Sequence, residues 1–189
     1  MIKAIIFDCF GVLYGGSLGI LAAMAAPEHH QEIYDINQAK DYGYISYPQY
    51  LQQIGDIVGR PPEDIDAVMS QHHIANTWLI DYAQSLRGSY KVGLLSNIGD
   101  QTMERLFDGK VESLFDEVVL SYREGIAKPS PEIFALMAER LAVAPGECIM
   151  IDDLMANCEG AEIAGMQSIL HTDNQLTQQY ITELTQKTV

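Results

Sequence analysis

The sequence has few cysteines, few basic residues and no long hydrophobic run. Its three cysteines form no metal-ligand spacing, so we expect reduced thiols, as in a cytoplasm. Lys and Arg number 11 against 26 Asp and Glu, which gives a formal net charge of -15. This charge argues against nucleic acid as a partner, because binding its phosphates requires a basic face. No apolar stretch is long enough to cross a bilayer, and residues 1–3 lead directly into a predicted strand. We therefore expect no signal peptide, no membrane partner and a cytoplasmic location.

What the sequence does contain is an alternation of apolar runs with amphipathic stretches. This pattern is typical of a parallel sheet wrapped by helices, and 189 residues with 48% hydrophobic content suffice for one α/β domain with an insertion. Strands are predicted at residues 4–8, 92–96, 117–120, 148–152 and 168–171, and helices at 102–107, 131–141, 156–164 and 175–185. In the helix at 131–141, Ser130 is expected to cap and Pro131 to occupy the first turn.

Residues 15–87 interrupt this alternation and have helical periodicity throughout. Prolines and glycines divide the segment into five predicted helices, at 18–26, 32–40, 48–58, 62–71 and 74–86. Gly15 with Gly16, and Gly88 with Ser89, are candidate hinges of this insertion.

Polar residues follow the apolar runs at positions where parallel sheets place chemistry. Asp8 ends the first predicted strand, Ser96 ends the second, and Asp152 and Asp153 end a later one. Lys128 adds a cation, and the following Pro129 favours extended backbone at that lysine. Adjacent carboxylates repel each other unless they share a cation. Together a nucleophilic carboxylate, a hydroxyl, a lysine and an acidic pair indicate phosphoryl transfer assisted by a divalent metal.

These residues, in this order, resemble the four motifs of the haloacid dehalogenase superfamily. Asp8 matches the nucleophile, Ser96 the phosphate-binding hydroxyl, and Lys128 the cation. The acidic pair matches the metal ligands. The resemblance implies a Rossmann-like α/β core at 1–14 and 88–189, with a helical cap at 15–87 inserted after the first strand. The chain is most similar to small bacterial phosphatases of the glucose-1-phosphate type and to the phosphatase domain of soluble epoxide hydrolases, on the evidence of Leu95-Ser96-Asn97, Lys128-Pro129, Asp152-Asp153 with Asn157, and Gly43-Tyr44-Ile45-Ser46.

The resemblance also implies an activity and a cofactor. We expect a Mg²⁺-dependent phosphatase that hydrolyses a small phosphorylated metabolite, such as a sugar phosphate, through an aspartyl phosphate. Ser96, the backbone amide of Asn97 and Lys128 would bind the phosphate. The metal would be held by Asp8, the backbone carbonyl of Phe10, Asp153 and Asp152. Asp153 is expected to bind the metal directly and Asp152 more remotely, although the reverse assignment is also open.

Phe10 departs from the family pattern. Most phosphatases of this superfamily have a second aspartate there, which protonates the leaving oxygen and then activates water. Without it the chain could still turn over substrate, or it could be a catalytically impaired binding protein. A metal-independent 2-haloacid dehalogenase is a further alternative, although the pair Asp152 and Asp153 argues against it.

Several other residues have two readings. Ser96 could instead cap a helix, and Asn157 could brace the metal acids or begin a helix. Cys9 is expected to pack in the core. The pairs His29-His30 and His72-His73 cannot chelate alone, because adjacent helical side chains diverge by roughly 100°. Surface histidines are favoured, although a histidine of the insertion could also reach the site. The residues Tyr42, Tyr44, Tyr47 and Tyr50 could line a sugar-sized pocket or pack the insertion.

Overall fold

The computed structural model describes residues 1–98 and 100–186, and the core they form is a five-stranded parallel sheet. The strand order is β3-β2-β1-β4-β5, and Ile5 of β1 lies opposite Val92 of β2 and Ile149 of β4. This arrangement confirms the predicted α/β class. The strands are β1 (Ala4–Phe7), β2 (Lys91–Ser96), β3 (Glu117–Leu120), β4 (Cys148–Asp152) and β5 (Gln167–Leu170).

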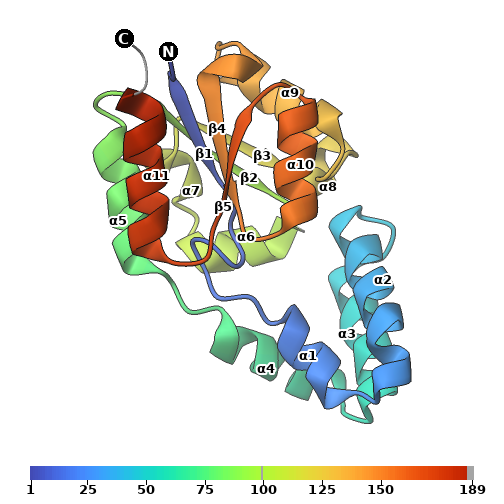
Figure 1. Cartoon of the computed structure of the whole chain (residues 1–189). Helices are drawn as coiled ribbons and strands as arrows, with labels where there is room; N and C mark the ends of the chain where they lie inside the picture. Colours follow the sequence, from blue (N-terminus) through green and yellow to red (C-terminus); the bar gives the residue numbers. More distant parts are fainter. Residues whose placement is uncertain (99, 187–189) are drawn as a thin grey trace.

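Helices cover both faces of the sheet, as Figure 1 shows. Alternate residues of a strand point to opposite faces, so Ile5 and Phe7 pack toward α5 (Thr77–Leu86) and α11 (Asn174–Gln186). Ala4 and Ile6 pack on the other face, with α9 (Pro131–Arg140), while α10 (Met155–Ile163) adds Ala161 to the same cluster. The short helices α6 (Asp100–Phe107) and α7 (Val111–Leu114) complete the first face.

Most predicted elements are present, with shifts of a few residues at their ends. The strands at 117–120 and 148–152 are observed with the predicted limits. The sequence did not predict α7, α8 (Ser121–Glu124) or the 3₁₀ turns Pro27–His29 and Pro145–Glu147, because so few residues show no helical period. Ser130 occupies the N-cap position of α9 and Pro131 its first turn, as predicted, but Ser130 makes no capping hydrogen bond. Its hydroxyl donates to the side chain of Glu132 instead of accepting a helix N–H.

Four α-helices of the insertion share a hydrophobic core of their own. They are α1 (Leu18–Met24), α2 (His30–Asp41), α3 (Tyr47–Val58) and α4 (Pro62–His72), and we call them the cap helices. A capping box formed by Ser46 and Gln49 starts α3, and Gly59, with a φ of 69°, ends it. The buried side chains between them include Leu21, Ile33, Tyr50, Ile54 and Ile65.

The fifth helix of the insertion, α5, packs elsewhere. Its residues Leu79 and Ala83 are buried in the same cluster as the first face of the sheet. The division into a core of 1–14 and 88–189 and a cap of 15–87 stays a prediction. Residues 99 and 187–189, which fall in the predicted core, lie outside the described residues. The packing of α5 nevertheless favours a cap that ends before Thr77.

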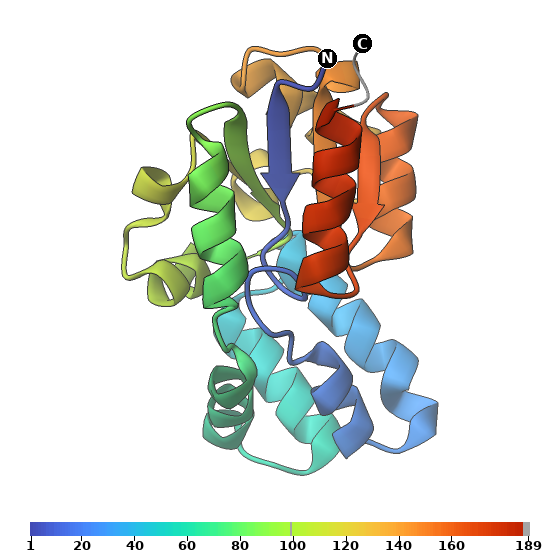
Figure 2. The same cartoon turned by 60° about the vertical axis from the view of Figure 1, so that its left-hand side comes forward.

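The cap helices lie below the carboxyl ends of the strands, as Figures 1 and 2 show from two directions. Polar contacts join them to the core, and they include a hydrogen bond and an ion pair. The hydroxyl of Ser121 in α8 donates to the carbonyl of Asp41 at the end of α2, at 2.6 Å, and the guanidinium of Arg105 in α6 lies 3.5 Å from Asp66 in α4. In the described part of the chain, no helix is long and apolar enough to span a membrane.

The topology also locates the switch point of the sheet, where the order in which strands are added reverses. The chain builds β1, β2 and β3 toward one edge and then returns to place β4 on the other side of β1. The carboxyl ends of β1 and β4 therefore flank a crevice, which is where open α/β sheets bind ligands. Asp8 directly follows β1, and Asp152 ends β4.

Candidate active site

Asp8 is held at the end of β1 with its carboxylate almost fully buried, at 7% exposure. Its backbone N–H donates to the carbonyl of Ile151 at 2.9 Å, which continues the pairing of β1 with β4. Its Oδ1 accepts a hydrogen bond from the N–H of Cys9 at 2.6 Å. Cys9 itself is buried in the core, as predicted. These contacts fix the direction of the Asp8 carboxylate.

Lys128 lies between two carboxylates, and its side chain is also buried. Its ammonium is 2.7 Å from Oδ1 of Asp8 and 2.5 Å from Oδ2 of Asp152. The side chain of Asn97 makes two hydrogen bonds to the backbone of Lys128. Its Nδ2 donates to the Lys128 carbonyl at 2.8 Å, and its Oδ1 accepts from the Lys128 N–H at 2.9 Å. The sequence singled out the backbone amide of Asn97 but missed this role of its side chain.

Asp152 is fully buried, and both of its oxygens have partners. Beyond the contact with Lys128, its Oδ1 accepts from the N–H of Leu154 at 3.0 Å and from Nδ2 of Asn157 at 2.9 Å. Asn157 does both things that the sequence suggested: it lies in the first turn of α10, and its side chain braces Asp152. These contacts favour Asp153, rather than Asp152, as the acid open to a ligand.

The carboxylate of Asp153 lies against Gly11 and occupies the space that a side chain at position 11 would fill. A Cβ built on Gly11 would come 2.1 Å from Oδ2 of Asp153, and the φ of Gly11, +81°, also favours glycine. Carboxylate oxygens of Asp8, Asp152 and Asp153 lie within 4.8 Å of one another. Three carboxylates against the single charge of Lys128 form a donor set that fits a hard divalent cation such as Mg²⁺.

The pKa values of these groups reflect burial and mutual repulsion. Burial raises the pKa of Asp8 to about 7, with a lowering contribution from Lys128 and a further raising contribution from Asp152. Burial, followed by repulsion from Asp152, also raises the pKa of Asp153. Burial alone would lower the pKa of Lys128, but Asp152 and Asp8 raise it above its ordinary value. The lysine therefore stays charged, and a cation among the carboxylates would favour their ionised forms.

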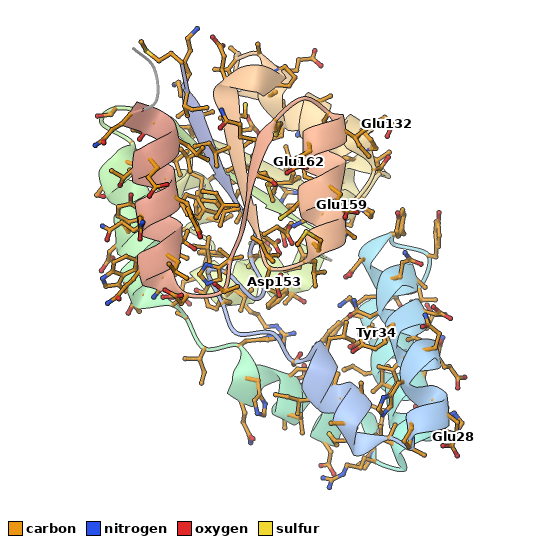
Figure 3. All side chains as sticks on the ribbon, viewed as in Figure 1. Glu28, Tyr34, Glu132, Asp153, Glu159 and Glu162 are labelled. Carbon is orange, nitrogen blue, oxygen red and sulfur yellow. The ribbon has the colours of Figure 1, made fainter. Side chains whose placement is uncertain are left out.

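A cavity of about 430 Å³ lies between these residues and the cap helices. Ser96, at the end of β2, and Phe10 line it from the core. The cap contributes side chains that the sequence analysis missed. Three of them, Tyr34, Asn37 and Asp41, are spaced three and four residues apart on α2 and so share one face, which was the available signal. Figure 3 shows Tyr34 on the core-facing side of α2 and Asp153 at the end of the core nearest the cap. The other residues of the insertion that line the cavity are Gly16, Ser17, Leu18, Gly19, Lys40, Met69 and His73.

Of the histidine pairs, His73 alone lines this cavity among the described residues. Its ring packs on Phe10 with centroids 4.6 Å apart, and its Nε2 lies 3.3 Å from the hydroxyl of Ser17. Burial lowers the pKa of His73 to about 4. A ring nitrogen of His72 instead contacts the carbonyl of Val68, so the adjacent rings diverge as predicted. His29 is exposed beside Glu32.

The four tyrosines weighed as a pocket wall pack among themselves and against cap residues. Tyr47 stacks on Tyr50, which is 1% exposed, and Tyr42 stacks on Tyr44, which is 78% exposed. None of the four belongs to the residues that line the cavity. The packing alternative holds for Tyr47 and Tyr50, which belong to the hydrophobic core of the cap, whereas Tyr44 is largely exposed.

Comparison with known proteins agrees with this geometry. The family model described as haloacid dehalogenase-like hydrolase matches residues 2–165. The chain is 31% identical to D-ribitol-5-phosphate phosphatase of Bacteroides thetaiotaomicron, with 89% of this chain and 91% of that protein covered. It is 27% identical to glyceraldehyde 3-phosphate phosphatase of Methanopyrus kandleri, with 89% and 83% covered.

A solved structure of a family enzyme from Bacteroides thetaiotaomicron, in complex with magnesium, superposes with a TM-score of 0.77. The two chains are 25% identical, and the match covers 95% of this chain and 98% of that one. An L-2-haloacid dehalogenase from Xanthobacter autotrophicus superposes with a TM-score of 0.63, at 19% identity and 97% and 83% coverage. The second likeness shows the shared fold.

Proposed function

The chain belongs to the haloacid dehalogenase-like hydrolase family, and from this premise we propose that it is a Mg²⁺-dependent phosphatase of small phosphorylated metabolites. The named relatives of 31% and 27% identity are phosphatases of a polyol phosphate and a triose phosphate. The proposal places the enzyme in the cytoplasm and gives it a small phosphomonoester, rather than nucleic acid or a membrane, as its partner.

One observation supports this proposal above the others, namely the position of the Lys128 ammonium. It contacts both Asp8 and Asp152, while Asp153 lies across Gly11 with its carboxylate close to both acids. A lysine that pairs with only two of three clustered acids leaves negative charge that a divalent cation would compensate. The cluster lies at the topological switch point between β1 and β4, beside the phosphate-binding candidate Ser96.

In the proposed reaction the Asp8 carboxylate attacks phosphorus. A new bond forms between Asp8 oxygen and phosphorus as the bond from phosphorus to the leaving oxygen breaks, and that oxygen then takes up a proton. Water next attacks the phosphorus of the aspartyl phosphate, which releases inorganic phosphate and restores Asp8. Lys128 favours the ionised form of Asp8 between turnovers and neutralises the phosphoryl oxygens, while Ser96 and the N–H of Asn97 bind those oxygens.

Asp8, Asp153 and the backbone carbonyl of Phe10 would hold Mg²⁺, with Asp152 as a more remote acid. When bound, the ion supplies charge neutralisation for the three carboxylates and the transferring phosphoryl group. Gly11 leaves room for Asp153 at this place, and Asn157 holds Asp152 in the orientation that reaches Lys128.

Turnover of an aryl phosphate tests this function directly. We expect hydrolysis of p-nitrophenyl phosphate that requires added Mg²⁺ and that is lost in Asp8→Asn. A matched control is Asp56→Asn, which alters an exposed cap acid that pairs with Gln52 within α3 and lies outside the cavity. Full activity in excess chelator would remove the metal-assisted mechanism and favour the dehalogenase alternative. The absence of any turnover, with phosphate still bound, would instead favour a catalytically impaired binding protein, for which Phe10 is the supporting observation.

A further inference from the structure

The carboxyl end of α2 carries a polar network that faces the cavity. Nδ2 of Asn37 donates to Oδ2 of Asp41 at 2.8 Å, and the ammonium of Lys40 donates to Oδ1 of Asn37 at 2.9 Å. The same ammonium lies 4.6 Å from the ring centre of Tyr50, which helps to fix its position. All three members of the network, Asn37, Lys40 and Asp41, line the cavity.

One oxygen of this network lacks a hydrogen bond. Asp41 is 9% exposed, and its buried Oδ1 has no hydrogen-bond partner among the described residues. Lys40 Nζ lies 3.2 Å from this oxygen and forms an ion pair with it. Burial raises the pKa of Asp41, against a lowering contribution from Lys40. The ion pair compensates its charge, but a carboxylate oxygen without a hydrogen bond keeps an open acceptor position, which points to a ligand that donates to it.

The backbone of Asp41 is tied to the loop that follows Ser96. The hydroxyl of Ser121 donates to the carbonyl of Asp41 at 2.6 Å and accepts from the N–H of Ile98 at 3.2 Å. Ile98 comes two residues after Ser96, at the end of β2. The polar network therefore has a fixed position relative to the proposed phosphate site, on the opposite wall of one cavity.

On the basis of the proposed phosphatase function, we propose that Asp41 and Lys40 form a hydroxyl-binding subsite, which selects phosphomonoesters of polyols or sugars. A hydroxyl both donates and accepts, so it can donate to Oδ1 of Asp41 and accept from the ammonium of Lys40. The carboxylate disfavours a second anionic group, such as another phosphate, at this place. A purely apolar substrate tail would displace water from both charged groups without replacing its hydrogen bonds, and is also disfavoured.

A matched pair of substrates tests this proposal: D-ribitol 5-phosphate and pentyl phosphate have the same chain length, and only the first has hydroxyls. We expect the wild-type protein with Mg²⁺ to favour ribitol phosphate in kcat/KM. Asp41→Leu should lower this preference by about tenfold to a hundredfold, as the loss of a hydrogen bond to a charged group predicts. Asp41→Asn, which keeps the size and an acceptor oxygen, should lower it by a smaller factor, and it decides the question where the leucine variant does not fold.

Asp56→Asn is the control, because Asp56 is an exposed cap acid whose carboxylate accepts a hydrogen bond from Gln52 within α3 and does not line the cavity. It should leave the preference unchanged. Equal turnover of the two substrates by the wild-type protein, or an equal loss on both substrates in the Asp41 variants, would overturn the subsite and indicate that water alone occupies it. Failure of the wild-type protein to hydrolyse any phosphomonoester would instead overturn the proposed function, so the two failures are distinguishable.

Discussion

Replacing Lys128 by methionine should impair both stability and turnover, and for the same reason. The ammonium of Lys128 is buried and lies 2.7 Å from Asp8 and 2.5 Å from Asp152. Methionine keeps most of the apolar stem but leaves the carboxylates without their cation. Removing one partner from a buried ion pair costs about 3–5 kcal/mol, so the free energy of unfolding of the metal-free protein should fall by this amount.

The loss in rate follows from the charge that develops during phosphoryl transfer. Removing one preorganised charged or polar partner of a reacting group typically costs about 10²–10³ in kcat, and we expect Lys128→Met to fall in this range with Mg²⁺ present. Stability and rate should also separate. In the double variant Lys128→Met with Asp152→Asn, one uncompensated carboxylate is gone, so stability should recover in part while kcat stays low.

Chemical unfolding and steady-state turnover of p-nitrophenyl phosphate measure the two effects. Lys3→Met is the control, because Lys3 forms a surface pair with Glu147 at 2.7 Å and its side chain is 57% exposed. Surface pairs contribute about 0–1 kcal/mol, so this variant should behave as the wild type. Near-normal turnover by Lys128→Met, with the fold intact, would refute the role assigned to the buried lysine.

Three further variants test other parts of the site. Gly11→Ala should weaken Mg²⁺ binding by about tenfold to a hundredfold, because its Cβ would meet Asp153, whereas Gly59→Ala has a similar φ of +69° with nothing within 4 Å and should leave Mg²⁺ affinity unchanged. Equal effects of both changes on the affinity, measured by calorimetry, would contradict the Asp153 site. Phe10→Asp should raise turnover of alkyl phosphates more than that of aryl phosphates, by up to about 10²–10⁴, because poor leaving groups benefit most from a general acid. An unchanged dependence of the rate on leaving-group pKa would mean that another group is the acid. His73 has a pKa of about 4 against an ordinary value of 6.5, so the unfolded chain binds a proton between these pH values that the folded protein does not. The free energy of unfolding should therefore rise with pH between about 4 and 6.5 because of this group. Unfolding curves of His73→Gln should show a smaller rise in that free energy over the same window than those of the wild type.

Much of the fold could be predicted because the core follows simple rules of pattern. Strands buried on both faces give apolar runs such as Ile5-Ile6-Phe7, and helices give a period of 3.6 residues. The strand order could not be predicted, because it depends on contacts between distant segments. The packing of α5 on the sheet was missed for the same reason, since an amphipathic helix carries no sign of which hydrophobic surface it covers.

The site divides in the same way. The positions of the core residues at the sheet edge could be predicted from the apolar runs, because Asp8 follows β1 and Asp152 ends β4. The cap side of the cavity could not, because the position of Asp41 depends on how the cap meets the core, which Ser121 helps to determine. The role of Asn97 was missed for a related reason, since its partner Lys128 lies 31 residues along the chain.

Trapping the phosphoenzyme tests the central claim most directly. Because Phe10 provides no base to activate water, hydrolysis of the aspartyl phosphate should be slow, and the intermediate should accumulate during turnover of an aryl phosphate with Mg²⁺. We predict that acid-quenched protein gains the mass of one phosphoryl group, that peptide mapping places it on Asp8, and that the gain is absent with chelator or in Asp8→Asn. Turnover with no adduct on Asp8, or an adduct that persists in Asp8→Asn, would contradict the proposed mechanism.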